Sequence, residues 1–281
     1  MRNLIILMLI VFLPGIIISQ EITLMSYNIR YDNEEDGVNV WFNRRDDVLA
    51  VIKKNNPEVL GIQEALVHQL KYLVDNTKYS YVGRGRDDGK EAGEFVPILF
   101  DTTRVKLLDS GMFWLSETPD KPSLGWDACC KRVVTWAEFE SAGKQFFYFN
   151  THFDHKGEVA VKMSSELLLK KVNEVVKNSA VFIGGDFNST IEGCSYQYFV
   201  DPEFSLRVMD SYTKAGELDY DRPTTYRGFD ISNAENGVMI DYIFFKNGIE
   251  ILSYKIDSSN NSIFYFSDHM PIVIRANFLR K

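Results

Sequence analysis

The sequence predicts an α/β domain. Short apolar segments of strand-like composition recur along the 281 residues and alternate with segments of helical spacing. Polar clusters interrupt these apolar segments, and an apolar content of 45% allows a large core. Length alone allows one or two domains, but no Pro/Gly/Ser-rich linker, low-complexity tract or internal repeat divides the chain.

The N-terminal segment predicts a signal peptide. A basic start at residues 1–3 precedes an apolar stretch at residues 4–18, and Ser19-Gln20 offers a cleavage point. We therefore expect a signal peptide at residues 1–19 and a mature domain at residues 20–281. Because the segment resembles bacterial export signals, we expect a periplasmic or extracellular protein without stable membrane insertion after cleavage.

The remaining elements follow in order along the chain. Strand-like segments are expected at residues 24–27, 59–62, 133–139, 145–150, 180–183, 241–245 and 271–276. Helical spacing is expected at residues 45–54, 65–74 and 161–176. Pro57 ends the first helical region, and the Leu and Val stripes of the helices are expected to cover a sheet.

Oxygen-bearing side chains stand at the ends of the first, second and last strand-like segments. Asn28 can bind a phosphate oxygen or a metal-bound water, although a turn-forming Asn is the simpler explanation. Glu64 is a hard oxygen ligand of the kind that Mg²⁺ prefers, or else an ordinary acid at a helix start. Asp268 and His269 directly precede the last strand, where the acid can hold a cation while the imidazole meets a phosphate.

The central strand-like segments end in further polar clusters. Alternation predicts that Asn150, His152 and Asp154 share one strand face, although a single His is more often structural than catalytic. Asp186 and Asn188 have the same two-residue spacing after Gly184-Gly185, where an Asx-type loop is the simpler explanation.

Asp241 opens another strand-like segment. It precedes four apolar residues, so it is expected to be half-buried. A buried carboxylate needs a partner, and a histidine is a common one.

The joint pattern is more specific than any of its parts. Strand-end clusters in the order Asn, Glu, His, Asp-x-Asn, Asp, Asp-His resemble the endonuclease/exonuclease/phosphatase family, which includes deoxyribonuclease I-like nucleases, inositol-polyphosphate 5-phosphatases and neutral sphingomyelinases. The resemblance covers residues 22–278. It implies a four-layer sandwich of two mixed β-sheets flanked by helices, and a metal-dependent phosphoesterase activity.

The resemblance also implies a metal site and a water-activating group. Asn28 and Glu64 match the early Asn and Glu of the family's metal site, and Asp268 matches its late Asp. Asp186 matches the Asp proposed to activate or orient the attacking water. Asn188 matches the Asn that positions the nucleophile and the phosphate.

Further positions match groups that contact the phosphate. His269 matches the imidazole on the scissile phosphate, held by the carboxylate at Asp241. His152 matches a position that contacts the phosphate or the leaving group. Arg132 matches a phosphate-contacting Arg or is simply solvated, and Glu94 matches a carboxylate that orients the His152 position in some members.

The chain departs from part of the family at Arg30, where some members carry an Asp. We therefore expect no second metal ligand at this position. The expected cofactor is Mg²⁺ or Mn²⁺, because a hard cation on Glu64 and Asp268 can neutralise phosphate charge. Accounts of the family differ on the general base and on whether one or two metals act.

The net charge of −8 bears on the substrate. Proteins that bind nucleic acid without sequence preference usually carry a basic patch, and no long basic stripe is visible here. A small or headgroup phosphoester is therefore favoured, with nucleic acid kept as a possible substrate of a secreted nuclease. We expect a monomer. Trp126 and Tyr226 could stack on a sugar or base, whereas Phe113 and Trp136 are expected in the core.

Two other classes of function were weighed. A non-catalytic binding module that keeps the fold is disfavoured because all the main catalytic positions are filled. A zinc hydrolase using His152, Asp154 and His155 is disfavoured because their spacing does not resemble a helical zinc motif and Asp/Glu/Asn sites favour Mg²⁺ or Mn²⁺. The three cysteines Cys129, Cys130 and Cys194 have no zinc-ligand spacing, so no structural zinc is expected, and either of the first two could pair with the third.

Overall fold

The computed structural model describes residues 21–201, 203, 208–218 and 224–279. The expected signal peptide at residues 1–19 lies outside these described residues. Among the helices of the described residues, none has the length and apolar character needed to cross a membrane.

The first sheet contains both the N-terminal and the C-terminal strand. Seven strands of the described residues pair in the order β10-β12-β13-β1-β2-β4-β3. Strands β1 and β2 are parallel, and β13 is antiparallel to β1. The strand bounds are β1 (Glu21–Asn28), β2 (Val59–Gln63), β3 (Tyr79–Val82), β4 (Ile98–Asp101), β10 (Glu217–Leu218), β12 (Ile249–Ile256) and β13 (Ile272–Phe278).

The second sheet is formed mainly by the middle of the chain. Six strands of the described residues pair in the order β5-β6-β7-β8-β11-β9. Strands β7 and β8 are parallel, while β11 is antiparallel to β8. The strand bounds are β5 (Lys106–Trp114), β6 (Val133–Ser141), β7 (Lys144–His152), β8 (Ala180–Asp186), β9 (Met209–Asp210) and β11 (Asp241–Lys246).

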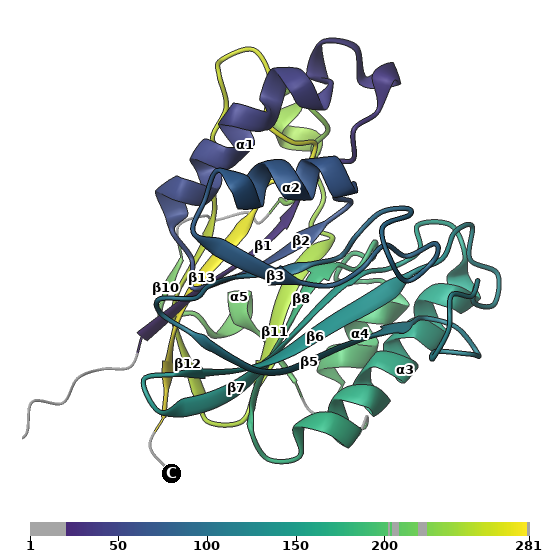
Figure 1. Ribbon diagram of the computed structural model, residues 1–281, viewed down its shortest axis with the longest axis vertical. Coiled ribbons are helices and arrows are strands. Elements are labelled where there is room, and N and C mark those ends of the chain that lie inside the picture. The colour runs from purple at the N-terminus through teal and green to yellow at the C-terminus, as the bar shows by residue number, and fades with distance from the viewer. Residues whose placement is uncertain (1–20, 202, 204–207, 219–223, 280–281) are drawn as a thin grey trace, which may run out of the picture.

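Helices cover the outer face of each sheet, which gives the four layers that the resemblance implied (Figure 1). Helices α1 (Trp41–Asn55) and α2 (Val67–Asp75) lie over the first sheet. Helices α3 (Glu158–Val176) and α4 (Cys194–Val200) lie beside the second sheet. The short elements are the helix α5 (Ser211–Lys214) and the 3-10 helices η1 (Glu34–Asn39) and η2 (Ile231–Asn236).

The alternation of apolar residues along β1 explains the layering. Ile22 and Leu24 belong to the large core between the sheets, whereas Met25 and Tyr27 pack into the core beneath α1 and α2. Successive side chains of a strand point to opposite faces, so one apolar run serves both layers. The tertiary setting thus requires β1 to be apolar on both sides.

The predicted segments lie where the sequence placed them. Each predicted helical and strand-like segment overlaps an observed element of the same type, with small shifts at the first residues of α2 and β13. Strands β3, β4, β5, β9, β10 and β12 were not predicted, and β5 in particular is largely exposed along its length.

The prediction for the face of β7 needs one correction. Strand β7 ends at His152, so Asp154 does not continue the face of Asn150 and His152. The Asp154 carboxylate instead accepts hydrogen bonds from the backbone N–H groups of Lys156 (2.9 Å) and Gly157 (2.8 Å). These bonds hold the turn that leads into α3.

Candidate active site

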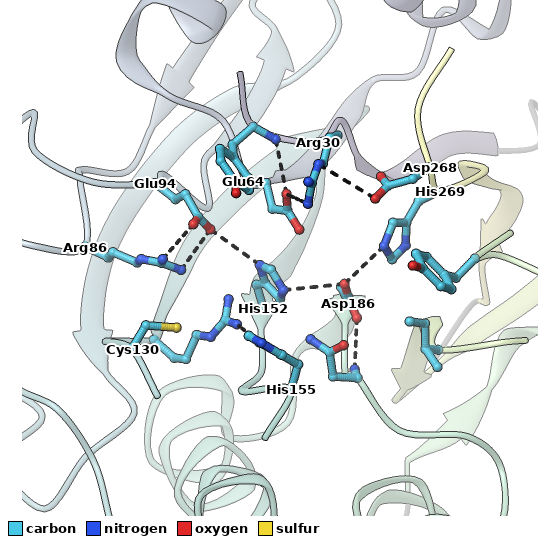
Figure 2. A pocket seen from close by; sticks show the side chains of 15 residues that line it. Arg30, Glu64, Arg86, Glu94, Cys130, His152, His155, Asp186, Asp268 and His269 are labelled. Carbon is cyan, nitrogen blue, oxygen red and sulfur yellow. Dashed lines mark hydrogen bonds and ion pairs between the residues drawn. The ribbon is translucent and has the colours of Figure 1, made fainter. Parts of the chain in front are cut away.

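One half-open cavity lies where the strand ends of the two sheets converge (Figure 2). Its volume is about 490 Å³. Acidic, imidazole and guanidinium groups share its wall. The lining residues are Arg30, Tyr31, Glu64, Arg86, Glu94, Cys130, Arg132, His152, His155, Asp186, Asn188, Tyr226, Ile240, Asp268 and His269.

Strand pairing in the second sheet places three of the predicted residues in one row. His152 is the register partner of Asp186 in the parallel pair β7–β8. Asp186 is in turn the register partner of Asp241 in the antiparallel pair β8–β11. The three side chains come together because the C-terminal ends of β7 and β8 meet the N-terminal end of β11.

Strand pairing in the first sheet likewise places predicted residues on the opposite wall of the cavity. Asn28 and Gln63 are register partners at the C-terminal ends of the parallel strands β1 and β2, and Glu64 follows directly. Strand β13 runs antiparallel to β1, so Asp268 and His269, just before β13, arrive at the same edge.

A buried amide connects the two sheets behind the site. The Asn150 Nδ2 on β7 donates to the carbonyl oxygens of Ile62 (2.7 Å) and Pro97 (2.8 Å). The Gln63 Nε2 donates to the Asn150 Oδ1 (2.6 Å). A Cβ at Gly61 would lie 2.7 Å from the Asn150 Oδ1, so only glycine fits between this amide and β2.

Asn28 links the carboxylates of both walls. Its Nδ2 lies 3.0 Å from the Glu64 Oε1 and 3.1 Å from the Asp186 Oδ2. Its Oδ1 accepts a hydrogen bond from the backbone N–H of Arg30 (3.0 Å). The amide therefore fixes the spacing of Glu64 and Asp186.

Arg30 lies between the two carboxylates expected to bind metal. Its Nη1 is 3.9 Å from the Glu64 Oε2, and its Nε is 3.9 Å from the Asp268 Oδ2. Two hydrogen bonds to Asp36, of 3.0 and 2.9 Å, hold the guanidinium in place. The position at which some family members carry an acid thus supplies a cation instead.

His269 and Asp241 form the predicted pair. The His269 Nδ1 lies 2.8 Å from the Asp241 Oδ2, and the Nε2 lies 3.6 Å from the Asp186 Oδ2. Burial of the ring opposes its protonation, but the charges of Asp241 and Asp186 prevail and raise the pKa of His269 well above its usual value. The imidazole is therefore cationic at neutral pH.

Asp186 lies at the centre of the polar network. Its Oδ2 is 3.5 Å from the His152 Nε2, and its Oδ1 accepts from the backbone N–H of Asn188 (2.9 Å). Burial, together with the charge of Asp241, raises the pKa of Asp186 to about 7. The Asn188 Nδ2 donates to the Phe153 carbonyl (3.0 Å), which ties the strand-end loops together.

His152 differs from His269 in its charge state. Burial and the positive charge of Arg132 hold the pKa of His152 well below its usual value, so this ring is neutral. Glu94 lies 3.9 Å from the His152 Nδ1, too far for a hydrogen bond, and the ring nitrogen has no hydrogen-bond partner among the described residues. Glu94 is held instead by Arg86 through contacts of 2.8 and 2.6 Å.

Arg132 is buried in the cavity wall with unused donors. Its side chain is 5% exposed, and its Nη1 has no hydrogen-bond partner in the described part of the chain, while its Nε forms an ion pair of 3.7 Å with the Asp154 Oδ2. Its Nη2 lies 3.1 Å from the His155 Nδ1. Buried donors are nearly always paired in proteins, so an anion beside Arg132 would satisfy a group that the protein leaves open.

The carboxylate set fits a hard cation. Burial and the charge of Glu64 act to raise the pKa of Asp268, an effect that nearby cations only partly offset. Glu64, His152 and Asp186 each place one ligand atom within 4.8 Å of the others. Oxygen-rich donors that repel one another in a buried site are the kind that bind Mg²⁺ or Mn²⁺.

Three of the nine non-glycine residues with positive φ in the described part of the chain line the cavity. Arg30, Glu64 and Asn188 have φ values of 57°, 65° and 47°. Non-glycine residues seldom adopt the left-handed region, and such strain concentrates at functional positions.

Comparison with known proteins assigns the fold to a family. The family model described as the Endonuclease/Exonuclease/phosphatase family matches residues 25–269. The chain belongs to this family. Its members are generally divalent-metal-dependent phosphoester hydrolases.

Solved and curated relatives support the assignment. An Endonuclease/Exonuclease/phosphatase from Bacteroides vulgatus is 35% identical, with a TM-score of 0.86, covering 92% of this chain and 99% of that chain. The mannosyl-6-phosphatase Bt3783 of Bacteroides thetaiotaomicron VPI-5482 is 33% identical, with a TM-score of 0.84, covering 92% and 100%. The uncharacterized protein L388 of Acanthamoeba polyphaga mimivirus is 26% identical over 83% of this chain and 91% of its own.

Sequence reasoning missed several lining residues of this family site. Arg30 was identified only as a departure, and Arg86, Cys130 and His155 were assigned no role at the pocket. Arg86 has a signal in hindsight, because it follows Gly85 in a loop and stands eight residues before its partner Glu94. The structure separates His152 from Asp154 and His155, which lie with Cys129, so the three do not form one zinc site among the described residues.

Aromatic residues divide between core and pocket. Phe113 is buried and Trp136 packs against the core, as expected. Tyr226 is 40% exposed, lines the cavity and lies with its ring 4.9 Å from that of His269. Trp126 is half-buried and lies outside the lining set.

Proposed function

We propose that the protein is a divalent-metal-dependent phosphoesterase that hydrolyses a small or headgroup phosphoester by direct attack of water. The observation that supports this most is the charge distribution of the cavity. Three guanidinium groups, those of Arg30, Arg86 and Arg132, surround a cavity of about 490 Å³ that also contains buried carboxylates. Such a cavity suits one phosphate with a small organic group.

Each predicted residue has a proposed part in this reaction. Glu64 and Asp268, with Asn28, would hold the cation, which would act as a Lewis acid and neutralise phosphate charge. Asp186 takes the proton of the attacking water, a task that suits a carboxylate whose pKa is about 7. Asn188 positions the water and the phosphate.

The two histidines are proposed to act differently. Cationic His269, oriented by Asp241, donates to the scissile phosphate. Neutral His152 contacts the phosphate or the leaving group, and its open Nδ1 can accept or donate a hydrogen bond there. Arg132 binds an equatorial phosphate oxygen through its Nη1, which has no hydrogen-bond partner among the described residues.

A sugar phosphate monoester is the first substrate to test. The mannosyl-6-phosphatase of Bacteroides thetaiotaomicron shares 33% identity and nearly the whole fold. Tyr226 lies partly exposed at the cavity and offers an aromatic surface for a sugar ring. The net charge of −8 is also unfavourable for a polymer with many phosphates.

The test is a phosphoester panel with Mg²⁺ or Mn²⁺. It should contain hexose 6-phosphates, inositol phosphates, sphingomyelin, DNA and RNA. We expect turnover of a small phosphoester that stops in excess chelator and returns with Mg²⁺. Full activity after dialysis against chelator would contradict metal dependence, and turnover of DNA or RNA alone would favour a secreted nuclease.

A variant separates the metal role from folding. We expect Glu64→Gln to need a higher Mg²⁺ concentration for activation than the wild type. Its melting temperature should stay close to that of the wild type. A lowered melting temperature together with an unchanged Mg²⁺ activation curve would show that Glu64 is structural.

Export is also part of the proposal. Residues 1–19 are proposed to be removed as a signal peptide, leaving a domain of residues 20–281 in the periplasm or outside the cell. N-terminal sequencing of the protein from the exported fraction should find a start near Gln20. A full-length chain retained in the cytoplasm would contradict this.

A further inference from the structure

A second cluster of metal-binding side chains lies beside the carboxylate site. Cys129 precedes β6, whereas Asp154 and His155 follow β7, and the fold brings the three together. The Cys129 Sγ is 3.2 Å from the Asp154 Oδ2 and 3.8 Å from the His155 Nδ1. One ligand atom from each residue lies within 4.8 Å of the other two.

The carboxylate of this cluster is fixed by backbone hydrogen bonds. The Asp154 Oδ1 accepts from the backbone N–H groups of Lys156 and Gly157, and its Oδ2 accepts from that of Cys129 (3.1 Å). Asp154 is fully buried, whereas Cys129 is exposed. The donor set is thus held in place on one side and open to solvent on the other.

A fourth donor stands within reach. The Cys130 Sγ lies 3.7 Å from both the Cys129 Sγ and the Asp154 Oδ2. Around a tetrahedral Zn²⁺, with bonds of about 2.3 Å to sulfur and about 2.0 Å to oxygen or nitrogen, neighbouring donors lie roughly 3.5–3.8 Å apart. The separations among the Cys129, Cys130 and Asp154 donor atoms approach these values, and the His155 Nδ1 lies 3.8 Å from the Cys129 Sγ.

The chemistry of this cluster differs from that of the catalytic site. Thiolate and imidazole are soft or intermediate ligands that select Zn²⁺, whereas Glu64, Asp186 and Asp268 offer oxygen. Cysteine spacing alone predicted no zinc site, because two of the donors come from a different loop.

We propose that Cys129, Asp154 and His155, with Cys130 as the fourth donor, bind one soft divalent cation such as Zn²⁺. Binding breaks the S–H bond of each coordinating cysteine and releases its proton to solvent, as the sulfur–metal bond forms. At Cys129 the cation takes the place of the proton that the thiol shares with the Asp154 carboxylate.

Metal binding at this cluster is coupled to the phosphate pocket through His155. A neutral imidazole has one lone-pair nitrogen, and in the structure that nitrogen accepts from the Arg132 Nη2 (3.1 Å). If the cation takes that lone pair, by either ring nitrogen, no acceptor remains for Arg132. A bound cation therefore breaks the Arg132–His155 hydrogen bond and frees the Arg132 Nη2 within the cavity.

The binding test uses Co²⁺ and Zn²⁺ with the purified full-length mature protein in saturating Mg²⁺. Co²⁺ should give a sulfur-to-metal charge-transfer band in the ultraviolet, and Zn²⁺ should abolish it at one equivalent. Cys129→Ser should lower the intensity of the band, which then comes from the Cys130 sulfur alone, and weaken Zn²⁺ binding at least about tenfold, since even loss of a partner behind a metal ligand typically costs about 10–100-fold. Cys130→Ser, at the fourth donor, should weaken binding less than Cys129→Ser.

Cys194→Ser is the matched control. Cys194 lines a neighbouring groove with Asp154 and His155 but stands outside the cluster. This variant should keep both the band and the Zn²⁺ affinity. A band of unchanged intensity in Cys129→Ser, or metal binding without any sulfur band in the wild type, would overturn the site.

The coupling has its own readout, which rests on the proposed phosphoesterase function. In saturating Mg²⁺, Zn²⁺ should change the KM for the best phosphoester of the panel in the wild type and leave it unchanged in Cys129→Ser. An equal Zn²⁺ effect in both proteins would place the ion at the carboxylates and overturn the coupling. If no phosphoester is turned over, the proposed function fails while the spectroscopic test of the site still stands.

Discussion

At the scale of single residues, His269 is the group whose charge depends most on its neighbours. Burial by itself would make the ring neutral, and the 2.8 Å contact with Asp241 reverses that preference. His152 and His269 both approach the Asp186 carboxylate, at 3.5 and 3.6 Å, but burial, reinforced by the charge of Arg132, lowers the pKa of His152 and keeps it neutral. The two imidazoles beside this carboxylate thus differ in charge, because His269 is cationic and His152 is neutral.

The His269–Asp241 pair should behave as one unit. We expect His269→Ala and Asp241→Ala each to lower kcat by about 10²-fold or more, as removal of a catalytic acid or base does. The double variant should be little worse than the worse single variant, because the carboxylate acts through the imidazole. Steady-state kinetics of the three proteins check this, and additive losses would show that the two residues act separately.

The positive charge of Arg30 should weaken Mg²⁺ binding and strengthen binding of the phosphate. Its guanidinium lies 3.9 Å from both Glu64 and Asp268, so its charge weakens Mg²⁺ binding and attracts the substrate. We expect Arg30→Ala to bind Mg²⁺ more tightly, by at least about threefold, while KM for the phosphoester rises.

Arg30→Lys keeps the charge and serves as the control. It should stay close to the wild type in both measurements, which are a Mg²⁺ activation curve and a substrate saturation curve. If Arg30→Ala weakens Mg²⁺ binding, the arginine supports the site structurally and the electrostatic explanation is wrong.

At the scale of the elements, the site depends on how β2 and β7 meet across the core. The Asn150 side chain satisfies two backbone carbonyls of the first sheet and accepts from Gln63. Asn150 stands two residues before His152 on β7. It also accepts a hydrogen bond from Gln63, the residue directly before Glu64. It therefore sets the distance between the two walls of the cavity.

Replacing Asn150 should cost both stability and activity. We expect Asn150→Ala to lower the free energy of unfolding by about 1–3 kcal/mol, because it removes three buried hydrogen bonds, those to the Ile62 and Pro97 carbonyls and that from Gln63. The kcat should fall as well, since the two walls lose their common anchor. Urea unfolding and steady-state kinetics measure the two effects.

Thr151→Val is a matched control on the same strand. Thr151 is fully buried, and its hydroxyl has no hydrogen-bond partner among the described residues. Valine keeps the shape and removes the unpaired hydroxyl, so unfolding free energy and kcat should remain near the wild-type values. A loss equal to that of Asn150→Ala would mean that any change in β7 disturbs the site.

At the scale of the whole molecule, the net charge of −8 and the cavity volume of about 490 Å³ bear on substrate size. An enzyme that follows a polymer neutralises many phosphates, and log K then falls by ~0.9 per contact for each unit of log salt. The proposed contacts serve one phosphate, so we expect a shallow salt dependence of kcat/KM on a sugar phosphate. A parallel salt series on duplex DNA checks this, and efficient, steeply salt-dependent DNA cleavage without small-ester turnover would contradict the substrate proposal.

The elements that the sequence predicted are those with a strong local signal. Residues 59–62 and 180–183 are short continuous apolar runs, and both become buried inner strands. Strand β5 escaped prediction because it is largely exposed and mixes polar with apolar residues. Local hydrophobic pattern reflects burial, so an exposed strand such as β5 leaves little trace. Strand β4 was also missed although it is buried at every residue, and it is only four residues long.

The candidate residues followed the same division. Asn28, Glu64 and Asp186 follow apolar runs, whereas Asp241 and His269 precede them, and the order of these polar clusters along the chain, with the family resemblance, predicted that they share one site. The two-residue alternation failed at Asp154, because β7 ends and the chain turns into α3. The proposed role of each residue stays a prediction until the kinetics are measured.

The sequence by itself determined the family, the layered α/β architecture and the strand-end residues, because these depend on local apolar pattern and on the order of polar clusters. Only the tertiary structure decided which groups meet. Arg30 beside Glu64 and Asp268, Arg132 against His155, and Cys129 beside Asp154 all join segments that the sequence leaves apart. Their proximity follows from strand register and sheet packing, which are set by long-range pairing and leave no signature in either segment alone.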